Sequence, residues 1–92
     1  VRFLNGVLDE NAELHPLKEQ REVAKNLRQI GLGLMGVADM FIKLGIRYGS
    51  DESIELIKKI GRVMINEALR ESAMLAKKDG PFPMYREKEF LA

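Results

Sequence analysis

The chain has 92 residues, 32% of them charged, and a formal net charge of +1. This balance gives no broad field to attract nucleic acid or a membrane surface, and no apolar run or leader marks a membrane or export segment, so we expect a cytoplasmic location and neither partner. The absence of cysteine excludes a disulfide scaffold, a thiolate metal site and a cysteine nucleophile in this stretch, and a single histidine excludes a His pair for a metal.

A first helix is predicted from the start of the chain to about Asp9, because apolar residues share one of its faces: Val1, Leu4 and Leu8. No capping residue begins this helix, and the other end of the chain has no polar finish. We expect apolar side chains to be exposed at both ends, as in a fragment of a longer polypeptide: Val1, Leu4, Phe90 and Leu91.

A polar stretch over 10–15 separates this helix from a second one, with Pro16 predicted in its first turn. The second helix has a narrow apolar stripe: Leu17, Val23, Ala24 and Leu27. His15 is predicted as a residue of the N-cap region rather than a ligand. Basic side chains recur on one side of the second helix and are predicted to form a solvated face rather than a phosphate site: Arg21, Lys25 and Arg28.

Residues 31–36 read G-x-G-x-x-G, the pattern of a dinucleotide-binding turn. That turn follows a buried strand, but residues 24–30 are too polar to be buried on both faces. The acid at the expected distance, Asp51, follows Gly49-Ser50 as in a helix start. We therefore interpret the glycines in another way, with a short extended segment over 29–32 and then a helix from about Leu34 to Leu44. Gly45 should close it in a left-handed conformation.

Ser50 is predicted to cap the longest helix, which Gly80-Pro81 should end after about 29 residues at the usual helical rise. Glu55 and Lys59, four residues apart, are predicted to pair. One apolar stripe follows the helical period: Ile54, Ile57, Ile60, Met64, Ala68 and Leu75. Further apolar residues widen it, so this helix should have neighbours on more than one side: Leu56, Val63, Ile65, Leu69 and Met74.

The remaining segments carry no convincing catalytic centre. Residues 82–85 are predicted to be an extended connector before a short helix within 86–92. Asp39 is interpreted as solvent-facing or as a structural acceptor, paired with Arg28 or Arg47 or placed at a helix end. Tyr48 is interpreted as a packing ring, and the five methionines as fillers of core gaps. We predict no catalytic, cofactor-binding or metal-binding residue.

Residues 28–39, RQIGLGLMGVAD, resemble the R-x-I-G-L-G-x-M-G-x-A-D segment in the catalytic subunit of ribonucleotide reductases. Residues 42–50 are similar to that family's I-x-L-G-I-x-Y-G-S, and residues 71–83 to its E-A-S-x-x-L-A-x-x-x-G-P-F-P. Upstream, residues 2–9 resemble R-F-L-D-N-V-I-D. The resemblance covers nearly all of the chain to about Tyr85 and is closest to the adenosylcobalamin-dependent class.

The resemblance implies a ten-stranded α/β barrel, of which residues 1–92 would be a single partial domain. We expect this fragment to be mainly α, with three to four helices and at most one short strand near 29–33. Residues 29–32 would form a barrel strand, with the helices at 34–44 and 51–79 packed outside it. The glycines would then serve close backbone approach rather than nucleotide binding.

The resemblance also implies radical reduction of ribonucleotides, diphosphates or triphosphates, to the deoxyribonucleotides used in DNA replication. The family's reactive cysteines, Glu and Asn have no counterpart here, so the fragment alone should be inactive and serve as a scaffold. Adenosylcobalamin, substrate and effector nucleotides would bind elsewhere in the parent, and the partner would be the remainder of the reductase chain.

The alternative is a self-standing helical protein-interaction module with an accidental glycine motif. It predicts a continuous helix or a simple turn over 28–33, where the fragment hypothesis predicts an extended segment without its barrel partners. Out of the barrel, the fragment is expected to pack as a helical bundle or to self-associate through its exposed apolar surface.

Overall fold

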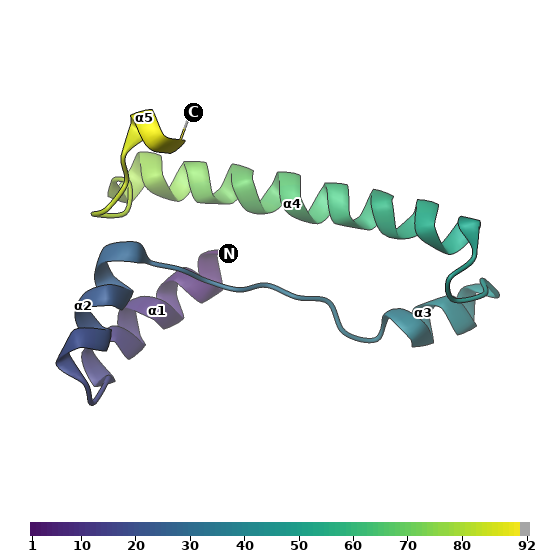
Figure 1. Ribbon diagram of the computed structural model, residues 1–92, viewed down its shortest axis with the longest axis horizontal. Helices are drawn as coiled ribbons and strands as arrows, with labels where there is room; N and C mark the ends of the chain where they lie inside the picture. The colour runs from purple at the N-terminus through teal and green to yellow at the C-terminus, as the bar shows by residue number, and fades with distance from the viewer. Residues whose placement is uncertain (91–92) are drawn as a thin grey trace. The chain divides into compact units, whose positions relative to one another are not determined.

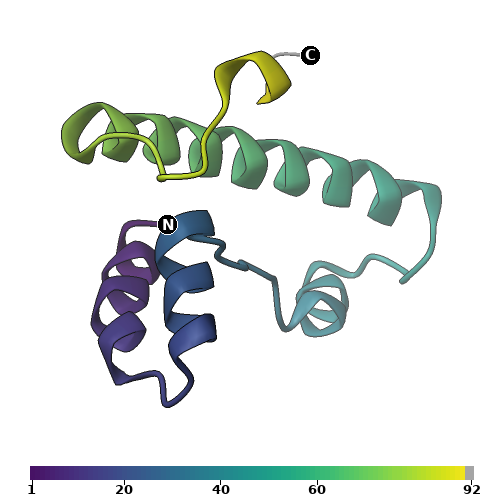
Figure 2. The same ribbon diagram turned by 60° about the vertical axis from the view of Figure 1, so that its left-hand side comes forward.

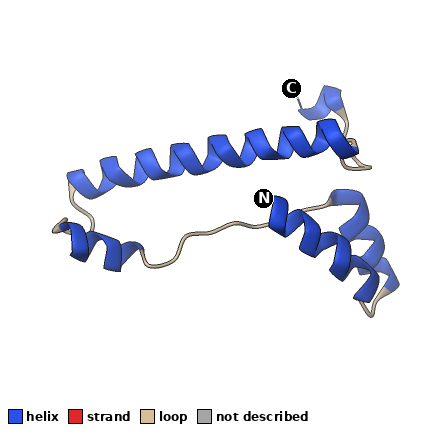
Figure 3. Cartoon of the chain, turned by 180° about the vertical axis from the view of Figure 1, so that it is seen from behind, coloured by secondary structure: helices blue, strands red, loops and turns tan. Residues whose placement is uncertain are grey.

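The computed structural model describes residues 1–90, and these residues form helices and loops but no strand (Figures 1 and 3). The helices are α1 (Arg2–Leu14), α2 (Lys18–Leu27), α3 (Val37–Leu44), α4 (Asp51–Asp79) and α5 (Glu87–Phe90). The mainly helical class predicted from the sequence is confirmed. The described chain divides into two compact units, one of residues 1–31 with those from Arg70 onward, the other of residues 32–69.

In the first unit, α1 and α2 lie side by side and run in opposite directions (Figure 2). α1 is longer than predicted, because it continues through the polar residues 10–14. The reason is Ala12, which lies one helical turn after Leu8 and is only 5% exposed. Pro16 also departs from the prediction, since α2 begins at Lys18 and Leu17 is its N-cap in an extended conformation.

The segment after α4 belongs to the same unit. Gly80, with φ of 86°, ends α4 as predicted. Residues 82–85 form a turn rather than the predicted extended connector, because the Tyr85 N–H donates to the Phe82 carbonyl at 2.9 Å. The two rings pack edge to face with centroids 5.6 Å apart. The Met84 N–H donates to the Asn26 carbonyl at 3.1 Å and thereby ties this turn to α2.

In the second unit, α3 begins at Val37, three residues later than predicted, because Gly36 takes a left-handed conformation as its N-cap. Gly45 closes the helix as predicted, with φ of 70°. Its N–H donates to the Ile42 carbonyl, and the next N–H donates to the Phe41 carbonyl at 2.9 Å. This pair of hydrogen bonds is a Schellman motif. The Phe41 ring, 2% exposed in this unit, meets Tyr48 edge to face at 5.8 Å.

The start of α4 is fixed by Ser50, as predicted. The Ser53 N–H donates to Ser50 Oγ at 3.2 Å, and Ser53 Oγ donates to the Ser50 carbonyl at 2.6 Å. Ser50 Oγ in turn donates to the Arg47 carbonyl at 2.6 Å. Further along, Glu55 pairs with Lys58 at 2.9 Å, so the predicted partner Lys59 is wrong by one position.

Few apolar side chains are buried among the described residues: Ala12 and Phe41. The methionines do not fill core gaps as predicted, since none is buried and Met35 is 98% exposed. Val1 and Leu4 are half-buried rather than exposed. The expectation for the side chains of Phe90 and Leu91 falls outside the described residues.

No helix within residues 1–90 has the length and apolar character that crossing a bilayer requires.

The capping role of Ser50 is testable by Ser50→Ala. We expect the first turn of α4 to lose about 1 kcal/mol of stability, because the Ser53 N–H loses its side-chain acceptor. Amide hydrogen exchange should show faster exchange at Ser53. Ser72→Ala, in the exposed interior of the same helix, is the control and should leave that exchange unchanged. Equal exchange at Ser53 in both variants would contradict the capping role.

Candidate functional site

The glycine motif lies in an irregular segment, residues 28–36, that follows a helix rather than a strand. No backbone hydrogen bond joins residues 29–35 to another residue of the described chain. Of its three glycines only Gly36 has a positive φ. A Cβ placed on Gly31 or Gly33 would meet no atom within 4 Å. The close backbone approach expected at these two glycines is therefore not made within this chain.

The basic set on α2 forms only in part the solvated face predicted for it, because Lys25 is 48% exposed but Arg28 only 25%, and both pair with α1. Lys25 Nζ donates to the Glu13 carboxylate of α1. Arg28 reaches two residues of α1, with Nη1 2.6 Å from Asp9 Oδ1 and Nη2 2.7 Å from Asn5 Oδ1. These contacts form a polar seam along the α1–α2 hairpin. A sequence signal for it existed, since three acceptors recur every four residues on α1: Asn5, Asp9 and Glu13.

Arg28 is the residue on which this seam depends most. It ends α2 with φ of 49°, a left-handed conformation that costs a non-glycine residue about 1 kcal/mol or more. Its N–H donates to the Ala24 carbonyl at 3.0 Å, and its side chain is 25% exposed. The two charge-assisted contacts to α1 offset the backbone cost, and they fix where residues 29–36 leave the hairpin.

The other acid in the seam, Glu13, is electrostatically perturbed. The hydrogen bond from Lys25 and the charge of its ammonium group lower the pKa of Glu13 below the ordinary value of 4.5, with Arg21 adding a smaller effect. A lowered pKa means that the pairing stabilises the folded hairpin above about pH 4.5 and is lost as pH falls through the folded-state pKa. Because the Glu13 side chain is 69% exposed, this contribution is small and sensitive to salt.

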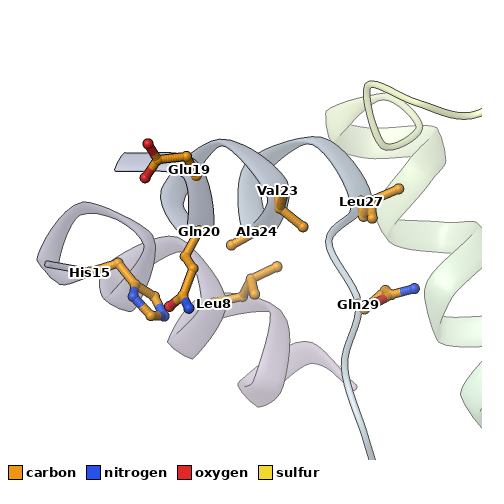
Figure 4. Close-up of a pocket in the computed structure, with 8 residues that line it drawn as sticks. All are labelled: Leu8, His15, Glu19, Gln20, Val23, Ala24, Leu27 and Gln29. Atoms are coloured by element: carbon orange, nitrogen blue, oxygen red, sulfur yellow. The ribbon is translucent and has the colours of Figure 1, made fainter. Parts of the chain in front are cut away.

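A groove of about 380 Å³ lies along the same hairpin and is lined by Leu8 from α1 and Ala24 from α2 (Figure 4). Its other lining residues are His15, Glu19, Gln20, Val23, Leu27 and Gln29. Val23 is 55% exposed, so this is an open apolar groove rather than an enclosed ligand cavity. Figure 4 shows His15 and Gln20 at one end and Leu27 and Gln29 at the other.

His15 is the C-cap of α1, and the N-cap of α2 is Leu17, so the predicted place of His15 in the N-cap region is wrong. Its Nδ1 and the Nε of Arg21 are buried without a hydrogen-bond partner in the described part of the chain. Asp39 is exposed in the first turn of α3, a position that favours an acid, and its predicted partner Arg28 pairs with Asp9. No group of three or more His, Cys, Asp or Glu residues with metal-binding geometry occurs within residues 1–90.

Apolar side chains of α4 remain open to solvent in the described chain, and the neighbours predicted on more than one side of this helix stay a prediction. Met74, 58% exposed, lies in the first unit, and four others lie along the part of the helix that belongs to the second unit: Ile54 at 46%, Val63 at 64%, Ile65 at 57% and Leu69 at 61%. A helix with this much exposed apolar surface is typical of one that is buried by further elements.

Comparison with known proteins shows which family this chain belongs to. The family described as "Ribonucleotide reductase, barrel domain" matches residues 1–92. A vitamin B12-dependent ribonucleoside-diphosphate reductase of Thermoplasma acidophilum is 39% identical over 90 residues, which cover 98% of this chain and 12% of that protein. A protein of the same description from Mycobacterium tuberculosis is 38% identical over 98% of this chain and 13% of its own length.

A ribonucleoside-diphosphate reductase large subunit of monkeypox virus is 40% identical over 92% of this chain and 11% of its own length. The chain therefore spans about one eighth of the length of the curated relatives it matches. No solved structure matches it.

The perturbation of Glu13 is tested by Lys25→Met, which keeps the aliphatic stem and removes the charge. We expect the pKa of Glu13 to rise toward 4.5, because its hydrogen-bond donor and nearest cation are gone. A pH titration of the Glu13 carboxyl carbon by NMR measures this change. Lys58→Met, which removes a cation paired with Glu55, is the control and should leave the Glu13 titration unchanged.

The strain at Arg28 is tested by comparing Arg28→Gly with Arg28→Ala. Both variants lose the contacts to α1, but only glycine accepts the left-handed backbone without cost. We expect Arg28→Ala to destabilise the hairpin by about 1 kcal/mol more than Arg28→Gly, as measured by urea titration followed by circular dichroism. Equal stability of the two variants would show that the backbone at this position is unstrained.

Proposed function

Because the chain belongs to the ribonucleotide reductase barrel-domain family, we propose that it is a scaffold segment of an enzyme that reduces ribonucleotides to deoxyribonucleotides by radical chemistry. The observation that carries the proposal is the family match over all of residues 1–92. The relatives' names support diphosphates as the substrates of the parent enzyme. On this proposal residues 1–92 form one internal segment of the barrel domain.

The chemistry available in this chain supports a scaffolding role. It has no cysteine to carry a thiyl radical or to supply electrons. What it offers is a capped helical framework: the polar seam holds α1 to α2, and Gly45 and Ser50 fix the ends of α3 and α4. Such a framework positions catalytic groups that other segments supply. The isolated chain is accordingly an inactive part of an oxidoreductase.

The cofactor of the parent enzyme is adenosylcobalamin on this proposal, supported by the vitamin B12-dependent relatives. The residues of this chain do not fit a site for it. The one histidine ends α1 beside an open groove of about 380 Å³, which is far too small and too shallow to enclose a corrin ring. We therefore assign the cofactor to segments outside these residues and derive no step through it.

The partner of this chain is the remainder of the reductase barrel, and substrate and effector nucleotides bind elsewhere in the parent. A cytoplasmic location and a role in supplying DNA replication belong to the same proposal. The alternative, a self-standing interaction module, predicts a continuous helix or a simple turn over 28–33. The irregular, unpaired segment there supports the fragment instead.

A chimera tests the proposed function. This chain replaces the matching 90-residue segment of the Thermoplasma acidophilum relative, with adenosylcobalamin and a ribonucleoside diphosphate supplied. We expect the chimera to retain reductase activity within about tenfold of the unmodified relative, a barrier change of about 1.4 kcal/mol, because the segment contributes packing rather than reacting groups.

The isolated 92-residue chain should show no activity under the same conditions. An unrelated helical segment of equal length in the same place is the control and should abolish activity. A folded chimera of this chain with no activity would contradict the proposed function.

A further inference from the structure

One glycine of α4 has no explanation within this chain. Gly61 lies in the middle of a 29-residue helix, where glycine lowers the local equilibrium for helix formation about fivefold relative to alanine. Its backbone is ordinary helix, since its φ is not positive. A Cβ built on it would meet no atom within 4 Å. Neither backbone conformation nor crowding within this chain therefore requires glycine at this position.

The surroundings of Gly61 are almost entirely apolar. The residues three, four and seven positions away on its face of the helix are Ile54, Ile57, Lys58, Met64, Ile65 and Ala68. None of them is buried, and Ile54, Ile57 and Ile65 are 46%, 37% and 57% exposed. Gly61 thus lies at the centre of an exposed apolar face, with no side chain of its own.

Gly6 of α1 provides an internal comparison. It is also a helical glycine with no atom near its hypothetical Cβ. Its neighbours three and four positions away are Arg2, Phe3, Asp9 and Glu10, which are mostly charged and exposed. A glycine in open, polar surroundings needs no contact to explain it. The apolar surroundings are what distinguish Gly61.

We propose that Gly61 marks the point where another segment of the reductase barrel domain crosses α4 in close backbone contact. The crossing segment belongs to the part of the barrel domain outside residues 1–92, because the chain matches the barrel-domain family throughout but spans only 12% of a relative's length. The absent side chain lets that segment approach closely, and the flanking isoleucines and methionine bury against it. This inference rests on the proposed function and adds a specific contact to it.

The test compares substitutions in two settings, the isolated chain and the Thermoplasma acidophilum chimera. In the isolated chain, Gly61→Ala and Gly6→Ala should each raise the helical content measured by circular dichroism, because both sites are open. In the chimera, Gly6→Ala should again be tolerated. Gly61→Leu should lower the midpoint of thermal unfolding by about 5 °C or more, since its side chain occupies the space of the crossing segment.

Glu55→Leu is the matched control on α4, because its neighbours three and four positions away are all charged: Asp51, Glu52, Lys58 and Lys59. It should change the midpoint of the chimera by less than about 2 °C. If Gly61→Leu prevents folding, Gly61→Ala gives the same test, with a lower midpoint in the chimera and a higher helical content in the isolated chain.

Several outcomes would overturn the inference. A Gly61→Leu chimera that melts within about 2 °C of the unsubstituted chimera would show that no segment crosses at Gly61. If the isolated chain dimerises in sedimentation analysis, and Gly61→Leu abolishes the dimer without affecting the chimera, the occupant is a second copy. An unsubstituted chimera that folds without activity contradicts the proposed function alone, because the melting comparison still decides the contact.

Discussion

The small number of buried apolar side chains is the constraint on which the rest of this structure depends. Ala12 and Phe41 lie in separate units and are the buried hydrophobic residues of the described chain. Burying a side chain as large as that of Phe41 contributes about 1.5–3 kcal/mol and a single methyl group such as that of Ala12 less, whereas ordering each residue costs about 1–2 kcal/mol of backbone entropy. Hydrophobic burial therefore cannot hold these helices by itself. Caps, polar contacts and surfaces that other segments cover must contribute the difference.

Those polar contacts were the hardest part of the fold to predict. Arg21, Lys25 and Arg28 read as a solvated face because sequence spacing shows which side chains share a side of α2, but not which helix lies opposite. The missing information was tertiary: α1 turns back on α2 and brings acids against that side. The same cause explains α1, whose polar end is helical because Ala12 is buried in the hairpin. Ala12 does continue the four-residue spacing of Leu4 and Leu8, but the polar residues beside it hid this signal.

The well-predicted features are those that a few neighbouring residues determine. Ser50 Oγ accepts a hydrogen bond from an N–H three residues away. The hydrogen bonds that close α3 at Gly45 likewise join residues no more than five positions apart. Gly80, followed by proline, ends α4 in the same local way. By contrast, the expected strand at 29–32 needs partner strands, which no residue within 1–90 provides. The methionines likewise have no core to fill, so Met35 is almost fully exposed.

The glycines separate what the chain determines for itself from what a larger architecture requires. Gly36, Gly45 and Gly80 have positive φ, a backbone conformation that glycine adopts at little cost, so local geometry accounts for them. Gly31 and Gly33 have neither a positive φ nor a near neighbour. Unlike Gly6, they lie among exposed apolar side chains, since Leu32 is 54% and Leu34 51% exposed, and such surroundings favour a contact with another segment. The chain belongs to a barrel-domain family. In such a domain, strands and helices are buried by segments distant in sequence, which are the kind of neighbour that could contact these glycines.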